Sequence, residues 1–167
     1  MLAALDGDQT SGTTIIESLK FLGKKTMWLP DSVLFQPPLT FMGLPYCTDP
    51  SKSGAAILGC PFDCGTHQFR VGARQGPQAI REQSGLVRRY QSELADIDFL
   101  TDLGAIDSGD VCLVPSRAED AFASIEEAAY RLALGGAVPV GFGGDGSVSL
   151  PLVRAASRVY PGLVLLH

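Results

Sequence analysis

The sequence predicts an α/β protein built around a parallel β-sheet. Three short apolar runs, at residues 55–60, 137–142 and 162–167, have the length and composition of buried strands. Segments with helical periodicity separate these runs. Strands that alternate with helices are typical of parallel sheets with right-handed crossovers. We therefore expect a doubly wound sheet, in which ligands bind at the carboxyl ends of the strands.

The first 53 residues differ in character from the rest of the chain. Residues 15–22 carry apolar side chains at helical spacing and predict one helix. Five of the eleven prolines lie in residues 29–53, and proline fixes φ and lacks a backbone donor, so an extended arm is expected there. The sequence leaves open whether this arm lies on its own domain or crosses to another subunit. We predict an N-terminal helix and Pro-rich arm over 1–53 and an α/β domain over 54–167.

The first helix expected in the α/β domain spans residues 76–90. Pro77 falls in its first turn, where the missing N–H of proline is tolerated. Ile80, Ser84 and Val87 lie at helical spacing and predict the buried face of this helix.

Two further helices follow. Ser116 and Glu119 form a capping-box pattern at the start of the second helix, and Gly135 ends it. The third helix is expected over 147–160, with Pro151 in its first turns. The second helix has the clearest apolar stripe in the chain, made by Phe122, Ile125, Ala129 and Leu132.

Composition argues against several classes of protein. The chain of 167 residues is 46% hydrophobic and 19% charged, which is typical of a globular domain. Its net charge is −5 and it has no basic stripe, so we expect no nucleic-acid partner. No run of about 18 apolar residues occurs, so we expect no membrane partner. The start of the chain lacks the basic residues of a secretory signal, and we expect a cytoplasmic protein.

The stretch VGFGGDGSVSLP, residues 140–151, permits two interpretations. Gly141, Gly143 and Gly146 follow the G-x-G-x-x-G spacing that dinucleotide-binding folds use to hold a pyrophosphate. That fingerprint also needs an acidic residue about 20 positions further on, and none stands there. Asp145 lies inside the loop, where its charge would repel a pyrophosphate. The second interpretation is a metal-binding signature in which a histidine follows the aspartate.

A longer block favours the second interpretation. Residues 59–81 read GCPFDCGTHQFRVGARQGPQAIR, and they match the pattern G-x-P-x-D-x-G-T-x-x-R-x-G-x-R-x-G-P-x-x-I-R with one additional residue between Thr66 and Arg70. The block, together with GGDGS and LVLLH, resembles the ureohydrolase family of arginase-like and agmatinase-like amidinohydrolases. The resemblance covers residues 54–167. The matching residues are Gly59, Pro61, Asp63, Gly65, Thr66, Arg70, Gly72, Arg74, Gly76, Pro77, Ile80 and Arg81.

The resemblance implies a fold, a cofactor and a reaction. The fold is a three-layer arginase-like α/β fold with a parallel sheet, expected to be incomplete in this chain. The cofactor is a pair of Mn²⁺ ions, which lower the pKa of a bound water and hold it as a nucleophile. The implied reaction is hydrolysis of a small guanidino substrate to urea and an amine, in a homo-oligomer.

The ligands that the resemblance implies are missing from this sequence. The first metal histidine of the family follows the aspartate of its G-G-D-H-S motif, and Gly146 stands there. The remaining ligands are expected beyond His167, so we expect no metal ligand and no catalytic residue in this chain. Asp145 is expected either to orient a metal site from outside or to cap the next helix. A fragment of a longer enzyme and a complete relative without metal both fit the sequence, and the fragment is favoured.

Three residues are candidates for the rim of a substrate pocket. They are Asp63, Thr66 and His67, in the loop after the first strand. Turn formation is the alternative role for Asp63 and Thr66, and simple exposure to solvent is the alternative for His67. Two other functions stay open: a non-catalytic paralogue that acts by packing with other subunits, and a dinucleotide-binding domain.

Overall fold

The computed structural model describes residues 38–66, 69, 71–87 and 98–166. The helix predicted at 15–22 and the first part of the Pro-rich arm lie outside these residues. Within them, three strands form one sheet: β1 (Ala55–Cys60), β2 (Ile106–Asp110) and β3 (Val138–Gly143). The main helices are α3 (Gly76–Ser84), α4 (Phe99–Asp102), α5 (Ala118–Leu134) and α6 (Ser149–Val159). Short 3-10 helices are η1 (Phe41–Gly43), η2 (Ala73–Gln75) and η4 (Gly146–Val148).

The sheet is parallel, with strand order β2-β1-β3. Its central strand, β1, is buried from Ala56 to Cys60, as the apolar run predicts. Ala56, Leu58 and Cys60 contact the larger core cluster, which includes residues of α5. Ile57 belongs to a second cluster on the opposite face of the sheet. The alternation follows from the period of two in a β-strand.

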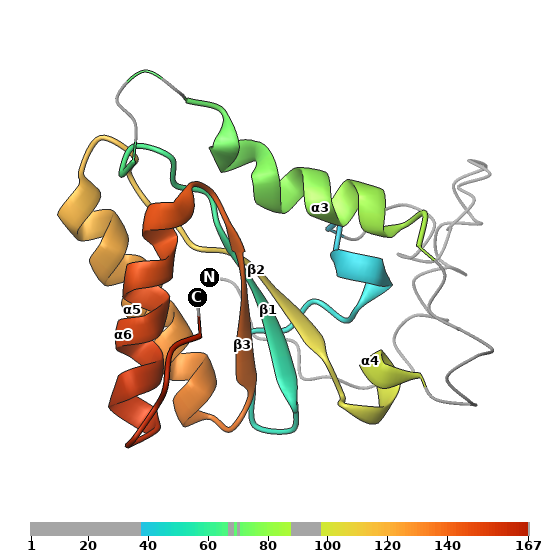
Figure 1. Ribbon diagram of the computed structural model, residues 1–167. Helices are drawn as coiled ribbons and strands as arrows, with labels where there is room; N and C mark the ends of the chain where they lie inside the picture. The colour runs from blue at the N-terminus through green and yellow to red at the C-terminus, as the bar shows by residue number, and fades with distance from the viewer. Residues whose placement is uncertain (1–37, 67–68, 70, 88–97, 167) are drawn as a thin grey trace, which may run out of the picture. The chain divides into compact units, whose positions relative to one another are not determined.

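Helices cover both faces of this sheet, so the α/β unit has three layers (Figure 1). α3 lies on one face, and α5 and α6 pack together on the other. The chain moves from β1 to β2 through α3, and from β2 back past β1 to β3 through α5. The first crossover runs from β1 toward β2, and the second runs in the opposite direction across the sheet to β3. If both are right-handed, their helices α3 and α5 must lie on opposite faces, as they do. The predicted α/β class with a parallel sheet is confirmed.

The apolar stripe of α5 forms the centre of the core. Ile125, Ala129 and Leu132 are buried, as predicted. Phe122 is half-buried, with its ring 5.3 Å from that of Phe62 in an edge-to-face arrangement. The predicted capping box is wrong, because the helix begins at Ala118 with no side-chain cap.

The predicted buried face of α3 is also wrong in part. Ile80 and Val87 are exposed, whereas Pro77, Arg81 and Ser84 are buried. Arg81 donates from Nε to Asp107 Oδ2 at 2.8 Å and from Nη1 to Asp110 Oδ1 at 2.5 Å. A buried ion pair, which apolar periodicity does not register, therefore sets the orientation of α3.

The sequence missed one strand and predicted another that does not form. β2, with the sequence IDSGD, has few apolar residues, and Asp107 within it is buried because Arg81 neutralises it. Residues 163–166 are exposed and belong to no strand of the described sheet. Apolar composition alone therefore misjudged both segments. His167 lies outside the described residues.

Residues 38–53 pack against the α/β unit. The ring of Phe41 lies 5.0 Å from that of Phe142, edge to face. The backbone of Tyr46 forms an isolated parallel β-bridge with Asp107 of β2, on the edge of β2 away from β1. This part of the arm lies on its own domain, and the predicted division at residue 53 stays a prediction. In the described part of the chain, no helix is both long and apolar enough to cross a membrane.

Candidate functional site

Two loops meet at the carboxyl edge of the sheet. The loop after β1 leads to α3 on one face, and the loop after β3 leads through η4 to α6 on the other (Figure 1). Neighbouring parallel strands whose connections diverge to opposite faces form a topological switch point, where ligands of such sheets bind. The two motifs singled out by the sequence therefore lie at the position where this fold class binds its ligands.

Asp145 joins these loops. Its Oδ2 accepts hydrogen bonds from the backbone N–H of Gly65 at 3.0 Å and of Thr66 at 2.9 Å. Its Oδ1 accepts from the N–H of Ser147 at 2.9 Å and from the Ser147 hydroxyl. Its own N–H donates to the carbonyl of Phe62 at 2.8 Å. The predicted capping role of Asp145 is thus confirmed, at the start of η4.

These donors keep Asp145 ionised. Burial raises the pKa of its carboxyl group, but hydrogen bonds from Ser147, Thr66 and Gly65 outweigh burial and lower the pKa below its ordinary value. The carboxylate stands at the N-terminal end of η4, where the dinucleotide interpretation would place a pyrophosphate. The structure therefore argues against the dinucleotide interpretation of the glycine-rich loop.

Asp63 anchors the loop after β1 from inside. Its side chain is fully buried. Its Oδ2 accepts from the N–H of Gly72 at 2.6 Å and of Arg74 at 3.1 Å, and its Oδ1 accepts from Arg74 Nε at 2.8 Å. The Arg74 guanidinium, helped by these backbone donors, holds the pKa of Asp63 well below its ordinary range despite burial.

The other predicted residues are less constrained. Thr66 is exposed, with its N–H bound to Asp145. His67 lies outside the described residues. Gly146 is exposed, and apart from its own atoms and those of its two chain neighbours no atom lies within 4 Å of the position that a Cβ would take. The roles of Asp63, Thr66 and His67 at a substrate rim stay predictions.

Sequence reasoning missed the contact between the two loops. Asp145 is 80 residues from Gly65, so no local pattern links them. The usable signal is topological, since both loops follow strands predicted to be parallel. Adjacent parallel strands bring their carboxyl ends to the same edge of a sheet.

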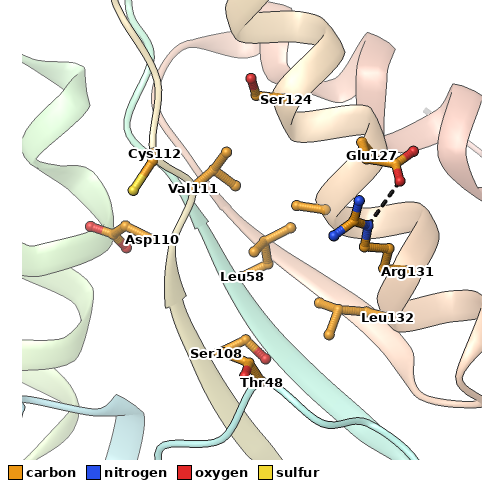
Figure 2. Close-up of a pocket in the computed structure, with 11 residues that line it drawn as sticks. Thr48, Leu58, Ser108, Asp110, Val111, Cys112, Ser124, Glu127, Arg131 and Leu132 are labelled. Atoms are coloured by element: carbon orange, nitrogen blue, oxygen red, sulfur yellow. Dashed lines mark hydrogen bonds and ion pairs between the residues drawn. The ribbon is translucent and has the colours of Figure 1, made fainter.

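A separate cavity of about 490 Å³ lies between β2 and α5. Figure 2 shows Asp110 on one side of it, the Glu127–Arg131 ion pair on the other, and Leu58 between them. Its charged groups already form ion pairs within the protein: Asp110 with Arg81, and Glu127 with Arg131. No described residue of the two motif loops, which follow β1 (residues 61–72) and β3 (residues 144–148), lines this cavity. The site is therefore assigned to the edge between β1 and β3.

Comparison with known proteins identifies the family. The family model described as "Arginase family" matches residues 53–167, which include all three strands and both motif loops. The chain belongs to the arginase family.

Several members of the arginase family are clearly similar to this chain. Guanidinopropionase from Pseudomonas aeruginosa is 38% identical over 130 residues, covering 77% of this chain and 39% of that protein. Agmatinase from Bacillus subtilis is 35% identical over 116 residues, covering 70% of this chain and 39% of that protein. The chain spans about two fifths of the length of these curated relatives.

Solved structures of the arginase family agree with the observed fold. The proclavaminate amidinohydrolase of Streptomyces clavuligerus has a TM-score of 0.66 at 31% identity, covering 74% of this chain and 41% of that one. The formiminoglutamase of Trypanosoma cruzi, solved with Mn²⁺, has a TM-score of 0.61 at 30% identity, covering 73% of this chain and 41% of that one. The arginase-like fold predicted for this chain is thereby confirmed.

The described residues do not fit the manganese centre that the arginase family implies. No group of three or more His, Cys, Asp or Glu side chains in the described part of the chain could hold a metal ion. Gly146 has no side chain, and the neighbouring Asp145 carboxylate is held by other donors. No step of a reaction can be derived through a metal from these residues.

Proposed function

We propose that this chain is the N-terminal part of a hydrolase of guanidino compounds. In the proposed reaction, water attacks the guanidinium carbon, the C–N bond to the amine breaks, and urea and the amine are released. The observation that carries the proposal is the family match over the whole described α/β unit, residues 53–167. The names of similar proteins support it, since guanidinopropionase, agmatinase and guanidinobutyrase all denote action on guanidino compounds.

In this proposal, the chain shapes one side of the substrate site. The Asp63–Arg74 pair fixes the course of the loop after β1, and Asp145 holds its Gly65–Thr66 segment against the loop after β3. The Asp63 charge is neutralised by Arg74, so a cationic substrate is recognised by other groups. We propose Thr66 and His67 as rim residues that contact the substrate.

The chain alone is proposed to be inactive, because its described residues supply neither a metal site nor an activated nucleophile. Mn²⁺ would be held by residues of another part of the protein. The identity of the guanidino substrate would be set there as well.

A reconstitution experiment tests the proposed function. The 167-residue chain is co-expressed with the portion of the Pseudomonas guanidinopropionase that it does not match, and urea release is measured with MnCl₂ and guanidinopropionate, guanidinobutyrate or agmatine. We expect urea from the combination and from neither part alone, with intact guanidinopropionase as the positive control. A co-purified complex that releases no urea from any of these compounds would favour the non-catalytic packing role instead.

A further inference from the structure

The carboxylate of Asp145 has no remaining capacity for a metal. An ionised carboxylate offers about four lone-pair positions. All four are directed to donors of this chain: two backbone N–H groups of the loop after β1, and the N–H and hydroxyl of Ser147. A cation could bind Asp145 only by displacing these donors and breaking the contact between the two loops.

The next residue offers no substitute. The space into which a side chain at Gly146 would point is open. No side chain from elsewhere in the described residues fills it and could act as a ligand there. The Ser147 hydroxyl donates to Asp145. Gly143 and Gly144, which precede Asp145, have no side chains.

We propose that the loop at residues 143–147 contributes no side-chain metal ligand, and that Asp145 is instead a positioning residue for the loop after β1. This inference goes beyond the proposed function and does not depend on the substrate. It predicts that an arginase-family metal centre completed by this chain would lack a protein ligand on the β3 side. The order of the Gly65–Thr66 segment would come from Asp145 and not from a metal.

The first test uses MnCl₂ and the 167-residue chain. Paramagnetic broadening of backbone amide signals reports which groups lie near bound Mn²⁺. We expect Gly65, Thr66 and Ser147 to be broadened no more than the exposed Glu119–Asp120 pair on α5, and we expect Asp145→Asn to leave this pattern unchanged. Selective broadening of the three loop amides in the wild-type chain would overturn the proposal.

The second test measures amide hydrogen exchange in Asp145→Asn. Asparagine keeps one acceptor oxygen, so it can retain the Gly65–Thr66 donors or the Ser147 donors, but not both sets. We expect exchange at one of the two sets to become about tenfold faster or more, because a hydrogen bond to a charged acceptor is lost. Unchanged exchange at all three amides would overturn the positioning role.

Glu119→Gln is the matched control, since it removes an exposed carboxyl group far along the chain from both loops. It should change neither the Mn²⁺ broadening nor the hydrogen exchange of the Gly65, Thr66 and Ser147 amides. Both tests are independent of turnover, so a negative reconstitution experiment would leave them interpretable.

Discussion

Gly144 and Gly146 are two residues apart, yet their surroundings are opposite. A Cβ at Gly144 would collide with the backbone carbonyls of Phe62 and Cys60, because the loop after β3 lies close to the end of β1 and its following loop there. A Cβ at Gly146 would meet nothing within 4 Å. The two glycines therefore serve different purposes within one motif.

Alanine substitutions at these two glycines should change the free energy of unfolding in opposite directions. Gly144→Ala should lower the free energy of unfolding by about 1–3 kcal/mol, since backbone atoms must move to admit the methyl group. Gly146→Ala should raise it by about 0.4–1 kcal/mol, because alanine restricts the unfolded chain and meets no obstacle in the folded one. Thermal unfolding of the two variants checks this. Equal destabilisation by both would contradict the close approach of the loops.

At the scale of elements, the Arg81 ion pairs connect α3 to β2. Asp107 is buried and accepts from Arg81 Nε and Nη2 and from the N–H of Phe41. Burial raises the pKa of Asp107, but these donors outweigh it and lower the pKa below its ordinary value. Arg81 thus orients α3 and neutralises the buried Asp107 of β2. Asp107 in turn accepts a hydrogen bond from η1 and helps to hold it in place.

Replacing this arginine should be costly. Arg81→Met should lower the free energy of unfolding by about 3–5 kcal/mol, because it leaves a buried carboxylate without its partner. Arg117→Met is the matched control, because it breaks the exposed Arg117–Asp120 pair at the start of α5. This change should lower the free energy of unfolding by less than about 1 kcal/mol. Similar effects in chemical unfolding of the two variants would show that the Arg81 network does not organise α3.

At the scale of the whole molecule, three carboxylates make stability depend on pH. The pKa values of Asp63, Asp107 and Asp145 all lie below the ordinary value of 3.8 in the folded chain. As the pH falls through 3.8, the unfolded chain binds protons first, so stabilisation present at neutral pH is lost toward the lower folded values. The melting temperature should therefore fall steeply below about pH 5. A melting temperature that stays constant down to about pH 3 would contradict these pairings.

Periodicity in the sequence was enough to predict the class of fold and much of its core. The apolar run of β1 and the stripe of α5 lie where local patterns placed them. Asp107 and Arg81 show why the rest was missed: each is polar, and each is buried only because the other neutralises it. The bonds from Asp145 to Gly65 and Thr66 depend on strand order, which no local pattern contains.

Urea release by the 167-residue chain alone, with MnCl₂ and a guanidino compound, tests the central claim most directly. The claim is that this chain has the fold of an arginase-family hydrolase without its metal centre. We predict that urea production will not exceed that of a sample without protein, while intact guanidinopropionase is active in the same assay. Manganese-dependent urea release by the purified chain would contradict the account, because the described residues contain no group that could hold the metal.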